Sequence, residues 1–184
     1  VTPDNGSELL GLELMQVTVG TLTRGEVGGI EASTVLLDSE GREVRVGDRV
    51  VPVDAQPYDL QFFPHAPKQQ LDYGRARVLA VADMLTSGGP HDVVALSVGA
   101  REGVDNGTVF SIWRVGSNTV DRVEHDPERG EDTISYKAKV RLPDEFAGHV
   151  MVFRTFDKVS YGLVMDSFKP SRVGYELKHP DARY

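Results

Sequence analysis

A seven-residue element with a central glycine recurs along this chain and constrains its fold more than any other feature. It occurs three times, the last with serine in its first position: Val44–Val50, Val104–Phe110 and Ser171–Leu177. Glycine adopts positive φ without steric cost, so it lets a chain turn sharply at the entry to a strand. The central residues are therefore interpreted as structural turn glycines: Gly47, Gly107 and Gly174.

Runs of β-forming residues surround these turns. Alternating apolar and polar residues predict strands at 12–23 and 32–37, and an apolar run predicts another at 76–84. Residues 91–114 are interpreted as two strands joined by a glycine-rich turn, a central β-hairpin. No long stretch has the i, i+3, i+4, i+7 spacing of an amphipathic helix. We therefore expect a mainly β fold with little helix, built as small β-barrel or sandwich-like units.

The last third of the chain resembles the first. The segment STVLLDSEGREVRVG ends at Gly47 and SYGLVMDSFKPSRVG ends at Gly174, and each glycine follows an Arg-Val pair. This similarity predicts two related β-units. The expected organisation is a flexible lead-in at 1–11, a first β-unit at 12–53, a proline- and aromatic-rich connector at 54–73, a second β-unit at 74–180 with a mobile acidic loop at 116–133, and a tail at 181–184.

Composition excludes several classes of protein. The 184 residues have a net charge of -8 and no basic stripe, so binding to nucleic acid is not expected. No apolar run approaches the roughly 18 residues of a membrane span. The absence of cysteine excludes disulfides, thiolate catalysis and cysteine-ligated metals. Because Val1 is not methionine, we expect a processed or truncated product.

Residues that would carry chemistry are scattered. The five histidines are widely spaced, and neither GxSxG nor GxxxxGK[ST] occurs. The adjacent pair Asp144-Glu145 is expected by chance among 28 acidic residues. The acidic stretch 125–132 lacks the ligand spacing of a calcium loop. The sequence therefore predicts no enzyme, and no catalytic residue, cofactor or metal site.

Aromatic residues are the best candidates for contact with a partner, because tryptophan and tyrosine are common in interface hot spots. Five of them are predicted to contact a partner: Tyr58, Phe62, Phe63 and Tyr73 of the connector, and Trp113 at the end of the central hairpin. The connector aromatics could instead pin that segment onto its own domain. Two further functions stay open at this point. One is a carbohydrate-binding module that stacks these rings on sugars, and the other is a hydrolase whose site assembles only in the fold.

Several segments resemble a known family. VVALSVGAREGVDNGTVFSIWR, LPDEFAGHVMVFRTFDKVSYGLVM and the closing SRVG resemble the C-terminal region of type IV pilus secretin-associated proteins, over about Leu12 to Pro180. That region is related to the C-terminal domain of the flagellar assembly protein T. Proteins of this family are periplasmic, occur in Gram-negative bacteria and carry an N-terminal LysM module that binds peptidoglycan. Nothing before Leu12 supplies a LysM module, so we expect it to be missing from this chain.

The resemblance implies a function without catalysis. The chain would be a periplasmic adaptor that associates with the outer-membrane secretin of the type IV pilus, in multiple copies around the secretin ring. The full-length protein would anchor that ring to peptidoglycan through its LysM module. The resemblance carries over no catalytic residue, and its matching motifs are turn and strand signatures.

Overall fold

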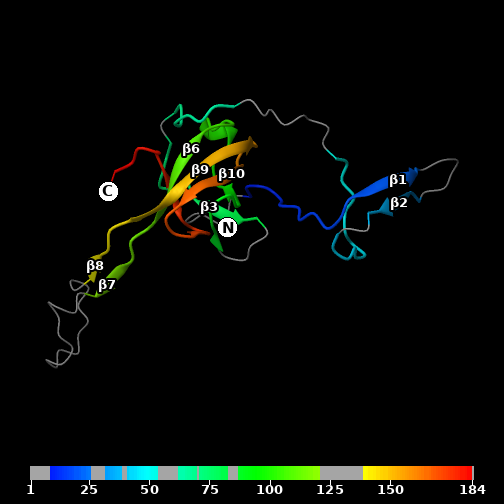
Figure 1. Ribbon diagram of the computed structural model, residues 1–184, viewed down its shortest axis with the longest axis horizontal. Coiled ribbons are helices and arrows are strands. Elements are labelled where there is room, and N and C mark those ends of the chain that lie inside the picture. Colours follow the sequence, from blue (N-terminus) through cyan, green and yellow to red (C-terminus); the bar gives the residue numbers. More distant parts are fainter. Residues whose placement is uncertain are drawn as a thin grey trace, which may run out of the picture. The chain divides into compact units, whose positions relative to one another are not determined.

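The structure, a computed structural model, describes residues 9–25, 32–38, 41–53, 62–69, 71–82, 87–120 and 139–183 (Figure 1). It is mainly β, because 43% of the described residues are in strands and only 2% in helix. The chain divides into two compact units. The larger unit consists of Val1–Gly11 and Leu60–Tyr184, and the smaller unit is Leu12–Asp59. None of the described helical residues forms a helix long and apolar enough to cross a membrane.

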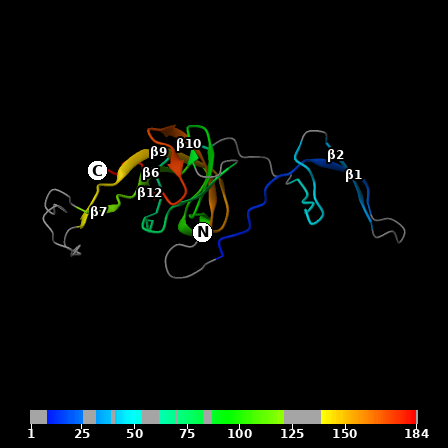
Figure 2. The same cartoon turned by 90° about the horizontal axis from the view of Figure 1, so that it is seen from below.

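The larger unit is built on one antiparallel sheet that curls into a half-barrel (Figure 2). Its six strands are, in spatial order, β12 (Glu176–Lys178), β6 (Val109–Arg114), β9 (Glu145–Thr155), β10 (Ser160–Ser167), β5 (Val93–Leu96) and β3 (Val78–Val81). The register shifts once between β6 and β9 and twice between β9 and β10. Such bulges increase the local twist, and this explains the curl.

The two edge strands of the half-barrel are joined by backbone hydrogen bonds. The amide of Val78 donates to the carbonyl oxygen of Tyr175 at 2.9 Å, and the amide of Leu177 donates to the carbonyl oxygen of Ala76 at 2.8 Å. Arg77 and Glu176 form an antiparallel bridge between them. Few edge amides and carbonyls of this sheet therefore face solvent where β3 meets β12.

The apolar core lies on the concave side of the sheet and follows the strand alternation. Phe110 and Ile112 of β6 point into it, whereas Ser111 and Trp113 lie on the opposite face. Eleven core side chains are fully buried: Ala76, Val78, Val94, Leu96, Phe110, Ile112, Ala147, Val150, Val152, Val164 and Leu177. At least one comes from each of the six strands, so the whole sheet contributes to this core.

The predicted central hairpin at 91–114 is wrong as a pairing, although both of its strands form. β5 pairs with β3 and β10, and β6 pairs with β9 and β12. The connection between β5 and β6 contains a short 3-10 helix, Ala100–Glu102. It crosses β9 and β10, which lie between β5 and β6 in the sheet. Residue alternation identifies the buried face of a strand but not its partner, which is why the pairing was missed.

The three turn glycines all have positive φ: 107° at Gly47, 96° at Gly107 and 89° at Gly174. Their surroundings differ. A Cβ at Gly107 would lie 2.5 Å from the carbonyl oxygen of Phe63, whereas nothing lies within 4 Å of that position at Gly47 or Gly174. Gly107 is therefore required both for its conformation and for the close approach of the connector.

A two-stranded ribbon extends from the half-barrel between β6 and β9. It consists of β7 (Asn118–Val120) and β8 (Lys139–Arg141), which pair antiparallel. The predicted mobile loop at 116–133 is wrong at its start, because 118–120 form a strand, and its remainder lies outside the described residues. Another small ladder pairs β4 (Ser87–Gly88) with β11 (Ser171–Arg172).

The smaller unit contains one hairpin, β1 (Gly20–Arg24) with β2 (Thr34–Leu37). Two further backbone bonds extend it, from the amide of Asp38 to the oxygen of Val19 and from the amide of Arg42 to the oxygen of Val17. The strand predicted at 12–23 is thus formed only from Gly20 onward. Like β9 and β10 of the larger unit, this hairpin is followed by a glycine with positive φ.

Candidate functional site

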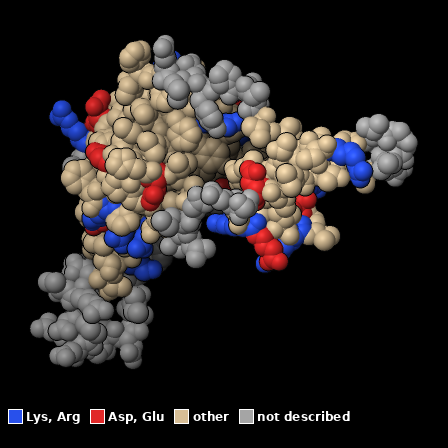
Figure 3. Space-filling view, turned by 45° about the vertical axis from the view of Figure 1, so that its right-hand side comes forward, with Lys and Arg blue, Asp and Glu red and all other residues tan. Residues whose placement is uncertain are grey.

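The described part of residues 12–53, here called the apolar segment, has no buried residue. Twelve of its large apolar side chains are exposed: Leu12, Leu14, Met15, Val19, Leu22, Leu36, Leu37, Val44, Val46, Val50, Val51 and Val53. Uncharged side chains make up most of the visible surface of this segment (Figure 3). Large apolar side chains exposed in this number are typical of surfaces that a partner covers.

The hairpin of the apolar segment carries apolar residues on both faces. Leu22 lies opposite Val35 on one face, and the neighbouring pair places Leu36 opposite Thr21 on the other. A strand with one buried face would leave one of these sets polar. An isolated two-stranded hairpin is only marginally stable in water. The apolar segment therefore has the composition of strands that are covered on two sides, and the described residues of its own unit do not cover it.

The connector is pinned to the half-barrel, and backbone hydrogen bonds of His65 make part of the contact. The amide of His65 donates to the oxygen of Gly107 at 3.0 Å, and the amide of Val109 donates to the oxygen of His65 at 2.9 Å. Nε2 of His65 also lies 3.2 Å from Oδ1 of Asp105, which is paired with Lys68 as well. His65 thus forms an isolated parallel bridge with Thr108, next to the start of β6.

The aromatic residues proposed for partner binding have different surroundings. Tyr58 lies outside the described residues. Phe62 is half-buried, and Phe63 is 84% exposed on the pinned connector. Tyr73 packs against the core, and this burial raises the pKa of its hydroxyl. Of these connector residues, Phe63 has the surface needed to contact a partner.

Trp113 is only 2% exposed and lies on the convex face of the sheet. Its Nε1 donates to Oγ of Ser111 at 2.8 Å, and Lys178 Nζ lies 4.7 Å from the ring centroid. The ring of Phe146 packs edge-on against it at 5.5 Å. A sugar-stacking platform needs an accessible ring face, so the geometry of Trp113 favours packing over the carbohydrate-binding alternative.

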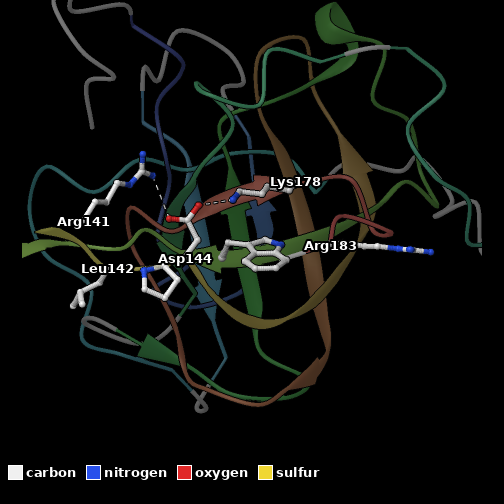
Figure 4. A pocket seen from close by; sticks show the side chains of 7 residues that line it. Arg141, Leu142, Asp144, Lys178 and Arg183 are labelled. Atoms are coloured by element: carbon white, nitrogen blue, oxygen red, sulfur yellow. Dashed lines mark hydrogen bonds and ion pairs between the residues drawn. The ribbon is translucent and has the colours of Figure 1, made fainter.

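A pocket of about 380 Å³ opens beside Trp113, where the ribbon joins β9 (Figure 4). Its lining comes from three separate parts of the chain: Trp113, then Arg141, Leu142, Pro143 and Asp144, then Lys178 and Arg183. The pocket therefore depends on the fold and has no sequence motif.

Asp144 organises the charges of this pocket. Its carboxylate accepts hydrogen bonds from the amide of Gly116 at 3.0 Å, from Lys178 Nζ at 2.6 Å and from Arg141 Nη2 at 3.3 Å. The bond from Gly116, followed by that from Lys178, lowers the pKa of Asp144 from 3.8 to about 2. The carboxylate is therefore ionised at neutral pH and holds both cations in place.

The neighbouring Glu145 is also paired. Lys169 Nζ lies 2.7 Å from its carboxylate and Arg114 Nη1 lies 3.2 Å away. The hydrogen bond from Lys169 is the main cause of the lowered pKa of Glu145. A general acid needs a raised pKa, so neither Asp144 nor Glu145 has the electrostatics of the general acid that a carboxylate-based hydrolase requires.

Metal ligands do not cluster in the described residues. No group of three histidine, aspartate or glutamate side chains there could hold an ion. His149 pairs only with a single carboxylate, with Nδ1 3.0 Å from Asp166 Oδ1.

Sequence reasoning missed both the pocket and the uncovered state of the apolar segment. The second had a visible signal, because Leu36 and Leu37 are adjacent apolar residues that must point to opposite faces of a strand. No pattern in the sequence indicated the pocket, because its lining residues are far apart along the chain. No protein-family model, no curated protein and no solved structure matches this chain.

Proposed function

We propose that this chain is a non-catalytic periplasmic adaptor of the type IV pilus secretin, and that the apolar segment is the part that docks on it. The observation that carries the proposal is the exposure of apolar side chains on both faces of the β1–β2 hairpin. The sequence resemblance described above supports the secretin as the partner. The ion-paired Asp144 and Glu145 support a function without catalysis.

Docking would occur by strand addition. Among the residues that the structure describes, each strand of the hairpin pairs along one edge only, so an extended partner segment can hydrogen-bond to the other. The partner would also cover Leu22 on one face and Leu36 on the other. Since the hairpin is marginal alone, part of its folding free energy would come from the secretin.

The half-barrel would serve as the rigid body of the adaptor. Its edges are joined and its core is buried, so it can fold without the partner. Multiple copies around a secretin ring would add avidity, and individual contacts need not be strong. In the full-length protein, the LysM module implied by the resemblance would connect this assembly to peptidoglycan.

Co-purification with the detergent-solubilised secretin tests the proposal. Val46 and Val173 offer a matched pair, because both precede a turn glycine with positive φ and both are exposed. Val46 lies in the apolar segment and Val173 in the larger unit. The double variant L36D/V46D should lose most of its binding, about tenfold or more per buried apolar side chain. V173D should bind as the wild type does.

Equal co-elution of L36D/V46D and wild type would show that the apolar segment does not dock on the secretin. Loss of binding in V173D alone would place the contact on the half-barrel and overturn the proposal in the same way. Circular dichroism of each variant controls for folding of the larger unit.

A further inference from the structure

We propose that the pocket beside Trp113 binds a carboxylate carried on an apolar group, with Arg183 as the charge partner. The site lies in the larger unit and includes no residue of the apolar segment, so it is independent of the proposed docking.

The pocket is positively charged although the chain is acidic. Three cations line it, Arg141, Lys178 and Arg183, against the single carboxylate of Asp144, in a chain whose net charge is -8. Lys and Arg side chains gather where the ribbon leaves the larger unit (Figure 3). A local excess of positive charge with apolar walls concentrates anions.

Internal ion pairs use two of the three cations. Asp144 holds Lys178 and Arg141 by the hydrogen bonds marked in Figure 4. Arg183 forms no ion pair with any residue that the structure describes. A guanidinium presents its donors in a planar fork that matches a carboxylate, so Arg183 can accept this ligand without breaking an existing pair.

The backbone beside Arg183 is fixed to the sheet. The amide of Ala182 donates to the oxygen of His179 at 2.9 Å, and the same oxygen accepts a bond of 2.7 Å from Oγ of Ser111. Ser111 in turn accepts the Trp113 indole N–H. The chain that bears Arg183 is thus tied to β6 and to the indole at the pocket.

The apolar walls of the pocket indicate what kind of group carries the carboxylate of the ligand. Leu142 is 45% exposed, and it lines the pocket together with Pro143 and Trp113. The volume of about 380 Å³ lies at the lower end of the range for small-ligand sites. The ligand is therefore a carboxylate with a small apolar substituent, such as the C-terminus of a peptide that ends in an apolar residue.

Fluorescence gives a direct measurement, because Trp113 is the only tryptophan of the chain. The whole chain is titrated with N-acetyl-leucine, with its neutral counterpart N-acetyl-leucinamide and with glucuronate. N-acetyl-leucine should give a saturable change and the amide should give none. A response to glucuronate without one to N-acetyl-leucine would contradict the apolar substituent and overturn the proposal.

Arg183→Gln should weaken binding of the acid by about 10- to 100-fold, as expected for loss of a charge-assisted hydrogen bond. Arg75→Gln is the matched control, because Arg75 is an exposed arginine that does not line the pocket. An equal response to acid and amide, or unchanged affinity in Arg183→Gln, would overturn the proposal. Unchanged thermal melting of both variants separates loss of binding from loss of fold.

Discussion

The amide of Val78 donates to the carbonyl oxygen of Tyr175 at 2.9 Å, and this bond joins the two edges of the curled sheet. The half-barrel thereby satisfies its backbone groups where β3 meets β12 and buries one apolar face. The β1–β2 hairpin has no joined edges and no buried face among the described residues of its own unit. This contrast between a self-sufficient unit and an uncovered one is the physical basis of the adaptor proposal.

Two leucine truncations should differ sharply in cost. Leu177 is fully buried on β12, so Leu177→Ala should lower the free energy of unfolding by about 2 to 5 kcal/mol. Leu36 is 65% exposed on β2, so Leu36→Ala should change it by less than about 0.5 kcal/mol. Urea denaturation of the isolated chain measures both. A large cost for Leu36→Ala would mean that the segment is covered within the free protein.

The turn glycines offer a second matched comparison. Gly47→Ala places a Cβ at φ 107° in open space, which should cost about 1 to 2 kcal/mol of local strain. Gly107→Ala also places a Cβ at positive φ, 96°, and in addition drives it against the oxygen of Phe63. It should therefore cost more, and it should release the connector.

Limited proteolysis of residues 62–69 measures this release. Faster cleavage in Gly107→Ala than in Gly47→Ala is the expected result. Equal cleavage rates would contradict the close contact between Gly107 and the connector.

The ion pairs of Asp144 should make stability depend on pH. The pKa of this carboxyl is about 2 in the folded chain, below its ordinary value of 3.8, so the unfolded state binds the proton more tightly. The stabilisation is fully present above the ordinary pKa and is lost as the pH falls toward 2. Urea denaturation of wild type and Asp144→Asn should show a difference that shrinks over this range. A difference that stays constant from pH 6 to pH 2 would contradict the assignment.

The sequence predicted the class of the fold better than its connections. The apolar run at 76–84 contains β3, and the two runs within 91–114 contain β5 and β6. Their partners could not be predicted, because alternation shows which side of a strand is buried and carries no information on register between distant strands. The joined edges involve residues about a hundred positions apart, such as Val78 and Tyr175.

The candidate sites were less predictable than the fold. Trp113 was proposed as a surface anchor because of its residue type, but its neighbours on the convex face bury it. The pocket brings together Trp113, Asp144 and Lys178, and only the pairing of β6 with β9 and β12 makes them adjacent. Spacing along a chain cannot reveal a site formed in this way.

Amide hydrogen exchange of the free and secretin-bound chain tests the central claim most directly. In the free chain, residues 17–24 and 34–38 should exchange rapidly, while 93–96 and 109–114 of the half-barrel should be protected. Binding should slow exchange in the first set by strand addition and leave the second unchanged. Equal exchange of residues 17–24 and 34–38 with and without the secretin would contradict the claim that the apolar segment docks on it.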